Sequence, residues 1–397
     1  MTRRSGNAAR GDAPAQMARP DAGGRSRSID ALRGFVMVVM LLDHVRETFF
    51  LHMQVADPMD ARIVMPALFF TRMASMICAP VFVALTGLSA WLYGQKYGAG
   101  GTSAFLIRRG LFLMLLELTL VGFAWTAQFP PQTFWLQVIW AIGVSMIALA
   151  ALLHLPRFAV LALGILIVAG HDLLDPVRLA PGYAFYILWA LLHQREAFMV
   201  AGFMVKTSYP VLPWIGVILL GYAAGPWFAA SAAALRTRRL MTLGIGLIVG
   251  FLLLRAANVY GDAPWGVVPG DPLRTLMAFF ALTKYPPSLL FLALALGMGA
   301  ILLALFERLE GGRVSRWLVV LGGAPMFFYL LHLYVLRGLY LAALAIWGPT
   351  KGAVFGFDHL SSVWLCYAAL IVPLYFPTRW YSKLKQRRRD IGWLKYL

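Results

Sequence analysis

Residues 287–306 read PSLLFLALALGMGAILLALF and contain no charged side chain. A helix of this length rises about 30 Å, which matches the thickness of a hydrocarbon core. Apolar runs of similar length recur along the 397 residues, of which 60% are hydrophobic and only 13% are charged. A soluble protein of this size needs a more charged surface. The sequence therefore predicts an all-α fold, a polytopic integral membrane bundle of about ten transmembrane helices.

The distribution of basic residues predicts the orientation of this bundle. Lysine and arginine outnumber aspartate and glutamate by 35 to 17. Most of the basic residues fall in alternate loops and in the two tails, which predicts that both termini are cytoplasmic. Nucleic-acid binding is not expected, because the basic residues mark helix ends instead of forming a polar surface. The predicted membrane segments are residues 31–51, 66–93, 104–124, 134–153, 156–171, 210–230, 240–257, 287–306, 316–336 and 359–377.

The chain divides into one membrane domain and two basic tails. Residues 1–28 are rich in Arg, Gly, Ala and Pro and predict a disordered cytoplasmic tail. The membrane domain is expected over residues 29–380, and a second cytoplasmic tail over 381–397. Two stretches on the outer side, 181–209 and 271–287, are too apolar for plain loops. We expect them to form interfacial or re-entrant helices.

Ionisable residues inside the predicted membrane segments are the best functional candidates, because each costs about 2.5–3.5 kcal/mol to insert. The first segment carries the densest set, in MLLDHVRETFF at residues 40–50. Asp43 lies roughly 20 Å along the helix from Asp30, in the outer half of the bilayer. A carboxylate beside the imidazole of His44 suits a general base. The alternative is a hydrogen-bonded polar cluster that joins helices, or residues at the water boundary.

Polar residues of other segments lie at a similar depth and predict one water-filled cavity that opens outward. For the basic ones, snorkelling to the interface is an alternative. Glu117, in the middle of the third segment, is interpreted as one member of a structural pair, and the alternatives are a protonated carboxyl group or part of a proton path. The two cysteines lack metal-ligand spacing, and no metal site is predicted. The candidates are Arg72, Arg255, Asn258, Lys284, Tyr285 and His332.

The sequence resembles a known family in several blocks that occur in order along the membrane domain. They include SIDALRGFVMVVMLLDHVRETFF (28–50), LELT (116–119), LQVIWAIGVSM (136–146), TKYPPSLLFL (283–292) and PMFFYLLHLYVLRGL (325–339). These blocks resemble bacterial members of the heparan-alpha-glucosaminide N-acetyltransferase catalytic-domain family. The resemblance covers about residues 29–380 and implies a bacterial inner-membrane protein.

The resemblance implies a membrane-embedded transferase that uses cytoplasmic acetyl-CoA or another acyl-CoA as donor. The acceptor would be an amino sugar, glycan or lipid of the cell envelope at the outer face. The sequence departs from the family at the histidine proposed for the lysosomal relative, which lies in the loop after the first helix. His52 is the histidine of that loop here, and its neighbours do not match. A different base, a different acceptor or a different activity therefore stays open.

If the protein is an acyltransferase, each candidate residue has an expected role. His44, oriented by Asp43, would deprotonate the acceptor, and His332 would belong to the same catalytic set. Arg46, Arg72 and Lys284 would bind anionic acceptor groups or polarise the thioester carbonyl. Tyr285, Arg255 and Asn258 complete the expected substrate-binding residues.

Two further functions fit the same composition. A transporter or flippase of an envelope precursor would line its path with the same polar groups and would need no base. A structural partner of another membrane enzyme, and a homo-oligomer, are also compatible with the sequence. Inner-face arginines such as Arg108 and Arg109 could meet the phosphates of CoA, although topology signals explain them more simply.

Overall fold

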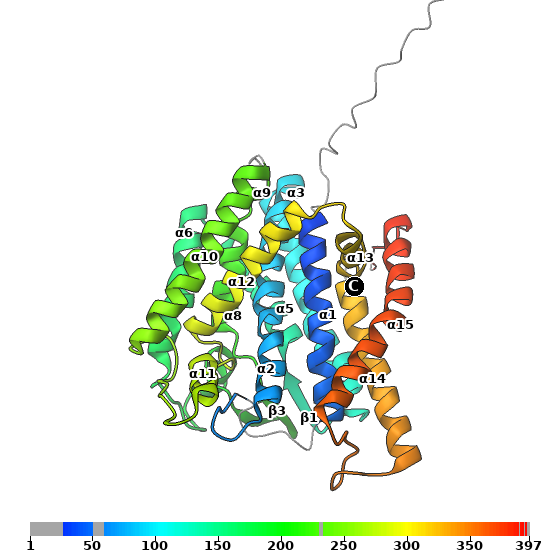
Figure 1. Cartoon of the computed structure of the whole chain (residues 1–397). Helices are drawn as coiled ribbons and strands as arrows, with labels where there is room; N and C mark the ends of the chain where they lie inside the picture. The colour runs from blue at the N-terminus through cyan, green and yellow to red at the C-terminus, as the bar shows by residue number, and fades with distance from the viewer. Residues whose placement is uncertain (1–26, 51–58, 230–232, 389, 393, 395–397) are drawn as a thin grey trace, which may run out of the picture.

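The computed structural model of the chain describes residues 27–50, 59–229, 233–388, 390–392 and 394 (Figure 1). The expected tail at 1–28 and His52 lie almost wholly outside this part of the chain. The α-helices are α1 (Arg27–Phe49), α2 (Pro66–Ala74), α3 (Cys78–Leu116), α4 (Gly122–Thr126), α5 (Val138–Leu152), α6 (Arg157–Gly170), α7 (Tyr186–Leu192), α8 (Leu212–Ala223), α9 (Pro226–Ala229), α10 (Ala233–Ala257), α11 (Pro272–Phe280), α12 (Leu289–Arg308), α13 (Arg313–Gly322), α14 (Pro325–Trp347) and α15 (Leu360–Arg387).

Short irregular helices and one small sheet complete the fold. A 3₁₀ turn η2 (Ser75–Ile77) joins α2 to α3, a π-helical segment η3 (Glu117–Val121) joins α3 to α4, and η4 (His171–Leu174) follows α6. The strands β1 (Thr133–Leu136), β2 (Ala197–Val200) and β3 (Phe203–Thr207) form a sheet in the order β1-β3-β2. Strand β3 pairs in parallel with β1 and antiparallel with β2. The fold is thus mostly helical, with a sheet that the all-α prediction missed.

Seven segments of the described chain are long and apolar enough to cross a membrane. The first, Pro66–Thr126, is 61 residues long and reverses direction at Gly98, where φ is 70°. The rings of Tyr93 and Phe105 stack at 4.5 Å, whereas twelve residues of straight helix would separate them by about 18 Å. The other six are Arg157–Leu174, Leu212–Ala229, Ala233–Ala257, Leu289–Arg308, Pro325–Trp347 and Leu360–Arg387.

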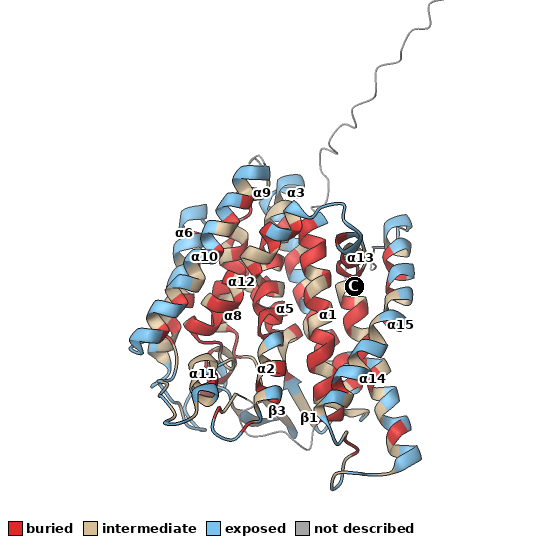
Figure 2. Cartoon of the chain, in the orientation of Figure 1, coloured by how far each residue is buried: buried red, intermediate tan, exposed pale blue. Residues whose placement is uncertain are grey.

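Helix α1 lies inside the bundle and packs against α3, α12, α13, α14 and α15. Figure 2 shows it largely buried. Its charged side chains would be costly in lipid, so the polar helix is surrounded by apolar ones. α1 begins and α15 ends at one end of the bundle, the top in Figure 1, and the sheet and α11 lie at the other. We call these the terminal end and the sheet end.

Glycines set the close approach of α1 to α13. A Cβ atom on Gly34 would lie 2.0 Å from the carbonyl oxygen of Leu318, and one on Gly322 would lie 1.8 Å from that of Asp30. Gly221 of α8 packs in the same way on Ala84 of α3, at 2.0 Å. Small residues allow backbones to approach closely in membrane bundles. This packing fixes the position of α1, which carries most of the candidate site.

Two predicted segments differ from the structure for clear physical reasons. The stretch 181–209 holds only the short helix α7, because Ala201 and Gly202 adopt positive φ values of 49° and 86° and close a hairpin between β2 and β3. Paired primed-turn residues of this kind match the twist of a two-stranded ribbon. In the stretch 271–287 a helix does form, α11. The predicted segment 316–336 is interrupted at Gly323 and Ala324, because Pro325 starts a new helix, α14, that continues to Trp347.

Candidate active site

Two cavities lie inside the bundle and share part of their lining. One, of about 560 Å³, extends toward the terminal end, and we call it the terminal cavity. The other, of about 740 Å³, extends toward the sheet end, and we call it the sheet cavity. Residues that line both mark the place where the cavities meet. They are Asp43, His44, Val138, Tyr209, Lys284 and Tyr329.

His44 and His332 form a hydrogen-bonded pair at this junction. His44 Nδ1 lies 2.6 Å from His332 Nε2, and His332 Nδ1 lies 2.7 Å from the carbonyl oxygen of Phe328. A carbonyl oxygen only accepts, so Nδ1 of His332 carries a proton and Nε2 of the neutral ring carries a lone pair. His44 Nδ1 then donates to it. The lone pair of His44 is left at Nε2, which is the arrangement that a general base requires.

Aromatic rings surround this pair. The rings of Trp125 and Tyr329 meet the ring of His44 edge-on, with centroids 5.3 and 5.8 Å away. His332 is fully buried, while His44 is partly accessible from the cavities. The packing restricts rotation of the His44 ring.

Asp43 binds two arginines instead of the neighbouring histidine. Arg46 Nη2 donates to Asp43 Oδ1 at 2.8 Å, and Arg72 Nη1 lies 3.0 and 3.1 Å from the two carboxylate oxygens. Both arginines also reach Glu47 Oε1 at 3.1 Å. The expected orientation of His44 by Asp43 is therefore corrected, since His332 holds the ring. The carboxylates neutralise the two buried guanidinium groups.

Tyr209 and Tyr285 extend this network. Their hydroxyl oxygens lie 3.3 Å apart, and Arg72 Nη2 lies 3.5 Å from the hydroxyl of Tyr285. Burial acts to raise the pKa of the Tyr285 hydroxyl, but Lys284 and Arg72 beside it hold the pKa below its ordinary value. Tyr285 is thus a stronger hydrogen-bond donor than an isolated tyrosine.

The sheet cavity carries a surplus of positive charge. Within the described chain, Arg195 and Lys284 form no ion pair, and each lies over the ring of Tyr285 at 5.2 Å. Arg337 donates to the carbonyl oxygen of Thr126 at 2.6 Å, but its buried Nε has no partner there. The cationic side chains of this lining are Arg46, Arg72, Arg195, Lys284 and Arg337, against the carboxylates of Asp43 and Glu47. A negatively charged ligand would neutralise this excess of positive charge.

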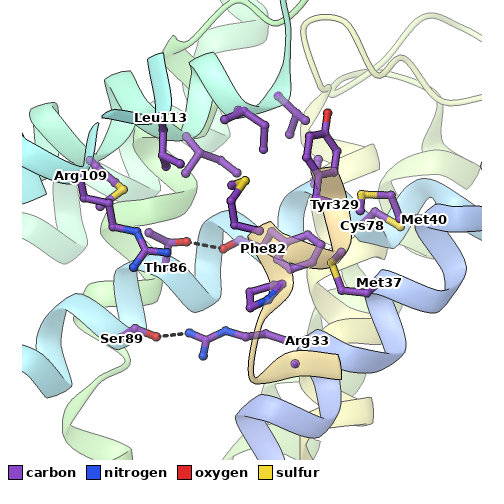
Figure 3. A pocket seen from close by; sticks show the side chains of 18 of the residues that line it. Arg33, Met37, Met40, Cys78, Phe82, Thr86, Ser89, Arg109, Leu113 and Tyr329 are labelled. Carbon is purple, nitrogen blue, oxygen red and sulfur yellow. Dashed lines mark hydrogen bonds between the residues drawn. The ribbon is translucent and has the colours of Figure 1, made fainter. Parts of the chain in front are cut away.

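The terminal cavity is apolar at its centre and basic at its outer part. Figure 3 shows Arg33 and Arg109 toward one side, and Met40, Cys78 and Tyr329 toward the other. Lys385 of α15 also lines it. Arg33 pairs with Asp30 at 3.2 Å and bonds Ser89. A ligand with a phosphate group at one end and a slender arm would match this polarity.

The chain matches the family model for the heparan-alpha-glucosaminide N-acetyltransferase catalytic domain over residues 25–260. The chain belongs to this family. The matched segment covers more than half of the chain and includes His44, Arg72 and the basic residues of the terminal cavity on α1 and α3. Lys284 and His332 lie beyond it. No curated relative matches. Membership indicates a membrane acetyltransferase in general terms, and the fold agrees with the membrane setting.

Arg255 and Asn258 have structural contacts in this family member, which corrects their expected role in substrate binding. The Arg255 guanidinium donates to four backbone carbonyl oxygens, those of Ala263, Ala278, Phe279 and Ala281, at 2.8–3.1 Å. The side chain of Asn258 bonds the backbone of Trp265 at 2.9 and 3.1 Å. Neither lines the two cavities.

Glu117 caps a helix of the same junction. Its Oε2 accepts from the backbone N–H groups of Ile139 and Trp140, at 3.0 and 3.1 Å, in the first turn of α5. A carboxylate at a helix N-terminus is favoured by the unpaired N–H groups and the helix dipole. Its partner is thus a helix end and not a second side chain. The described residues hold no group of three or more His, Cys, Asp or Glu side chains placed to bind a metal ion.

Sequence reasoning missed several residues of the candidate site. Tyr209 and Tyr329 line both cavities, and Arg195 and Arg337 line the sheet cavity. Tyr209 and Arg195 belong to the stretch that was expected to form an interfacial helix, and their place in the site depends on the hairpin. Arg337 lies five residues after His332 on α14. Residues five apart lie about 140° from one another around an α-helix, so this spacing gave no signal that Arg337 joins the site of His332.

Proposed function

We propose that the protein transfers an acetyl group from acetyl-CoA in the terminal cavity to an acceptor in the sheet cavity. The observation that carries this proposal is the position of His44, which lines both cavities and whose Nε2 is left unprotonated by the bond to His332. A base at the meeting point of two cavities can act on an acceptor from one and a donor from the other.

Charge and connectivity support one orientation of the chain in the membrane. Ten spans result if α1 and α5 cross together with the seven apolar segments and if Pro66–Thr126 crosses twice around Gly98. An even number places both termini on one side, and the basic residues at the terminal end make that side the cytoplasm. The terminal cavity then faces the cytoplasmic supply of acetyl-CoA in the bacterial inner membrane, and the sheet cavity faces outward.

In the proposed reaction His44 acts as general base. Its Nε2 takes a proton from an amine or hydroxyl of the acceptor as that group attacks the thioester carbonyl carbon. The imidazolium is stabilised because His44 Nδ1 donates to His332 Nε2. The new C–N or C–O bond forms, the C–S bond breaks, and the proton passes from His44 to the leaving sulfur. The products are the acetylated acceptor and free CoA.

Lys284 and Tyr285 complete the proposed site. Lys284 lines both cavities beside His44 and would stabilise the negative charge on the carbonyl oxygen during attack. Tyr285 lines the sheet cavity, where its hydroxyl can donate to the acceptor. Arg46 and Arg72 are neutralised by carboxylates, so Arg195 and Arg337 are better placed to bind an anionic acceptor. We favour an amino sugar that carries a negative group.

The proposed donor site predicts that substitution of Arg109 weakens the binding of acetyl-CoA. Arg109→Ala should weaken acetyl-CoA binding by about tenfold, because one charge-assisted contact to phosphate is lost. Arg108→Ala is the matched control, since Arg108 is the preceding residue of α3 and lines neither cavity. Equilibrium binding of acetyl-CoA to the purified variants measures both. Equal affinities would show that the basic residues of α3 serve only topology.

The acceptor site is tested with proteoliposomes that contain radiolabelled acetyl-CoA on the side of the terminal end. Glucosamine and glucosamine 6-phosphate are supplied as probe acceptors on the opposite side. We expect labelled acetyl-amino sugar on that opposite side, with the phosphorylated probe used more efficiently and this preference lost in Arg195→Ala.

A transporter of envelope precursors would give a different result in the same vesicles. Unmodified probe would cross the membrane, and acetyl-CoA would not be consumed. The meeting of two cavities at a histidine pair favours the transferase, because a pathway for a polar cargo requires no base at its centre.

A further inference from the structure

The loop between α11 and α12 carries two residues of the proposed site. Residues 283–288, here called the Lys284 loop, bring Lys284 and Tyr285 to the cavity lining. Lys284 and Pro287 form an isolated antiparallel bridge, and the N–H of Ser288 donates to the carbonyl oxygen of Thr283 at 2.9 Å. The loop is therefore closed at its base, and whatever holds the base sets the position of both side chains.

Asp262 holds both sides of this base. Its carboxylate accepts from the backbone N–H of Thr283 at 2.9 Å, from the Thr283 hydroxyl at 2.7 Å and from the Ser288 hydroxyl at 2.5 Å. A fourth bond comes from the N–H of Ala263 at 2.7 Å. Asp262 belongs to the loop after α10 and lines neither cavity, so its carboxylate acts on the site through Thr283 and Ser288 alone.

Neighbouring contacts fix the start of α12 against the same loop. Asp172 Oδ2 accepts from the N–H of Leu289 at 3.0 Å, and the N–H of Leu290 donates to the carbonyl oxygen of Gly261 at 3.1 Å. Ser288 also caps α12, accepting from the N–H of Phe291 at 3.1 Å. The side of the loop that leads into α12 thus has further anchors besides Asp262, while Thr283 is held by Asp262 and by the N–H of Ser288.

We infer that Asp262 is a positioning residue that sets the place of Lys284 at the junction of the two cavities and of Tyr285 in the sheet cavity beside it. That this position matters for catalysis rests on the proposed function. That Asp262 restrains the loop does not depend on the proposed function. An ionised carboxylate suits the task because four donors converge on its two oxygens. An asparagine would offer one oxygen, and its NH₂ group would face donors. Asp262→Asn therefore breaks the restraint at constant side-chain volume.

The first arm of the test measures the restraint without any enzyme activity. Lys284→Cys is introduced into the full chain with Cys78→Ser and Cys366→Ser, and the new thiol is modified by a water-soluble methanethiosulfonate reagent. Adding Asp262→Asn should raise the modification rate by about fivefold or more, because bonds to a charged acceptor are lost. Asp271→Asn is the matched control, since Asp271 caps α11 by accepting from the N–H of Arg274.

A milder variant covers failure of Asp262→Asn to fold. Thr283→Val removes one hydroxyl donor to Asp262 and leaves the backbone bond in place. It should still raise the modification rate more than about twofold above that of the Asp271→Asn control. Rates within about twofold of the Asp271→Asn control, in folded protein, would overturn the inference.

The second arm uses acetyl transfer in the chain with native Lys284. Asp262→Asn should lower kcat by about tenfold and leave the affinity for acetyl-CoA unchanged. In a Lys284→Ala, Tyr285→Phe background the same substitution should cost less than about twofold more, because the loop then carries neither of the two groups that Asp262 positions. A general loss of stability would instead add fully in both backgrounds. Absence of acetyl transfer in the wild type would contradict the proposed function, while the modification rates would still decide the role of Asp262.

Discussion

His44→Ala should lower the rate of acetyl transfer by about 10³-fold, within the range that general-base catalysis contributes. His44 lines both cavities, and its Nε2 carries no proton. Alanine has no group that can take the proton from the acceptor's amine or hydroxyl. Binding of acetyl-CoA should persist, because the basic side chains of the terminal cavity are unchanged. Rates of CoA release and binding affinities, measured on the same preparation, separate the two effects.

Substitutions of His332 test the second half of this pair. His332→Phe removes the acceptor of His44 Nδ1, so the rate should fall by about 10- to 100-fold. His332→Gln can present a side-chain oxygen to the same N–H and should retain more activity than the phenylalanine variant. Equal rates for the two variants would indicate that His332 contributes packing alone. A rate of His44→Ala close to the wild type would remove His44 from the mechanism.

Asp43→Ala should destabilise the fold by about 3–5 kcal/mol, the cost of leaving buried charges without a partner. Asp43 pairs with Arg46 and Arg72, and all three side chains are less than 10% exposed. Glu47 contacts both arginines but is 29% exposed, so it compensates only in part. The two guanidinium groups then lie in the middle of the bundle with a single partial counter-ion.

Unfolding in mixed micelles measures this effect, with Arg62→Ala as control. Arg62 also pairs with an aspartate, Asp60, at 2.8 Å, but its side chain is 84% exposed. Exposed pairs contribute little to stability. Equal stability of the Asp43 and Arg62 variants would show that the buried network is not a structural element of the bundle.

Hydropathy alone predicted the seven segments of the described chain that are long and apolar enough to cross a membrane, and α1 and α5 are not among them. The differences between the predicted and the observed segments arise at single residues. Pro325 ended one predicted helix early, and the two positive-φ residues Ala201 and Gly202 turned an expected interfacial helix into a hairpin. Backbone conformations of this kind depend on single residues that hydropathy averages out.

The sequence predicted a similar depth for the candidate residues, but it could not predict their rotation about each helix. His44 and His332 are 288 residues apart and meet at 2.6 Å, as candidates at equal depth on inward-facing sides of two helices can. Arg255 was predicted at a similar depth, yet its guanidinium is occupied by four backbone carbonyl groups. Composition cannot distinguish a charge that faces a cavity from one that holds a loop.

The site also depends on segments that carry no strong sequence pattern. Lys284 and Tyr285 reach the cavity lining through a loop whose base is held by Asp262, and Arg195 reaches the sheet cavity next to the β2–β3 hairpin. Such positions follow from hydrogen bonds between loops that are far apart in sequence. They became visible only with the fold.

The most direct test of the account is the use of acetyl-CoA by the purified protein and by His44→Ala. Thermal unfolding with and without acetyl-CoA reports binding, and a thiol-reactive dye reports CoA release in the presence of glucosamine 6-phosphate. The account predicts that acetyl-CoA stabilises both proteins and that CoA is released by the wild type alone. The account is contradicted if acetyl-CoA does not stabilise the folded wild type and no CoA is released. That result would favour a transporter.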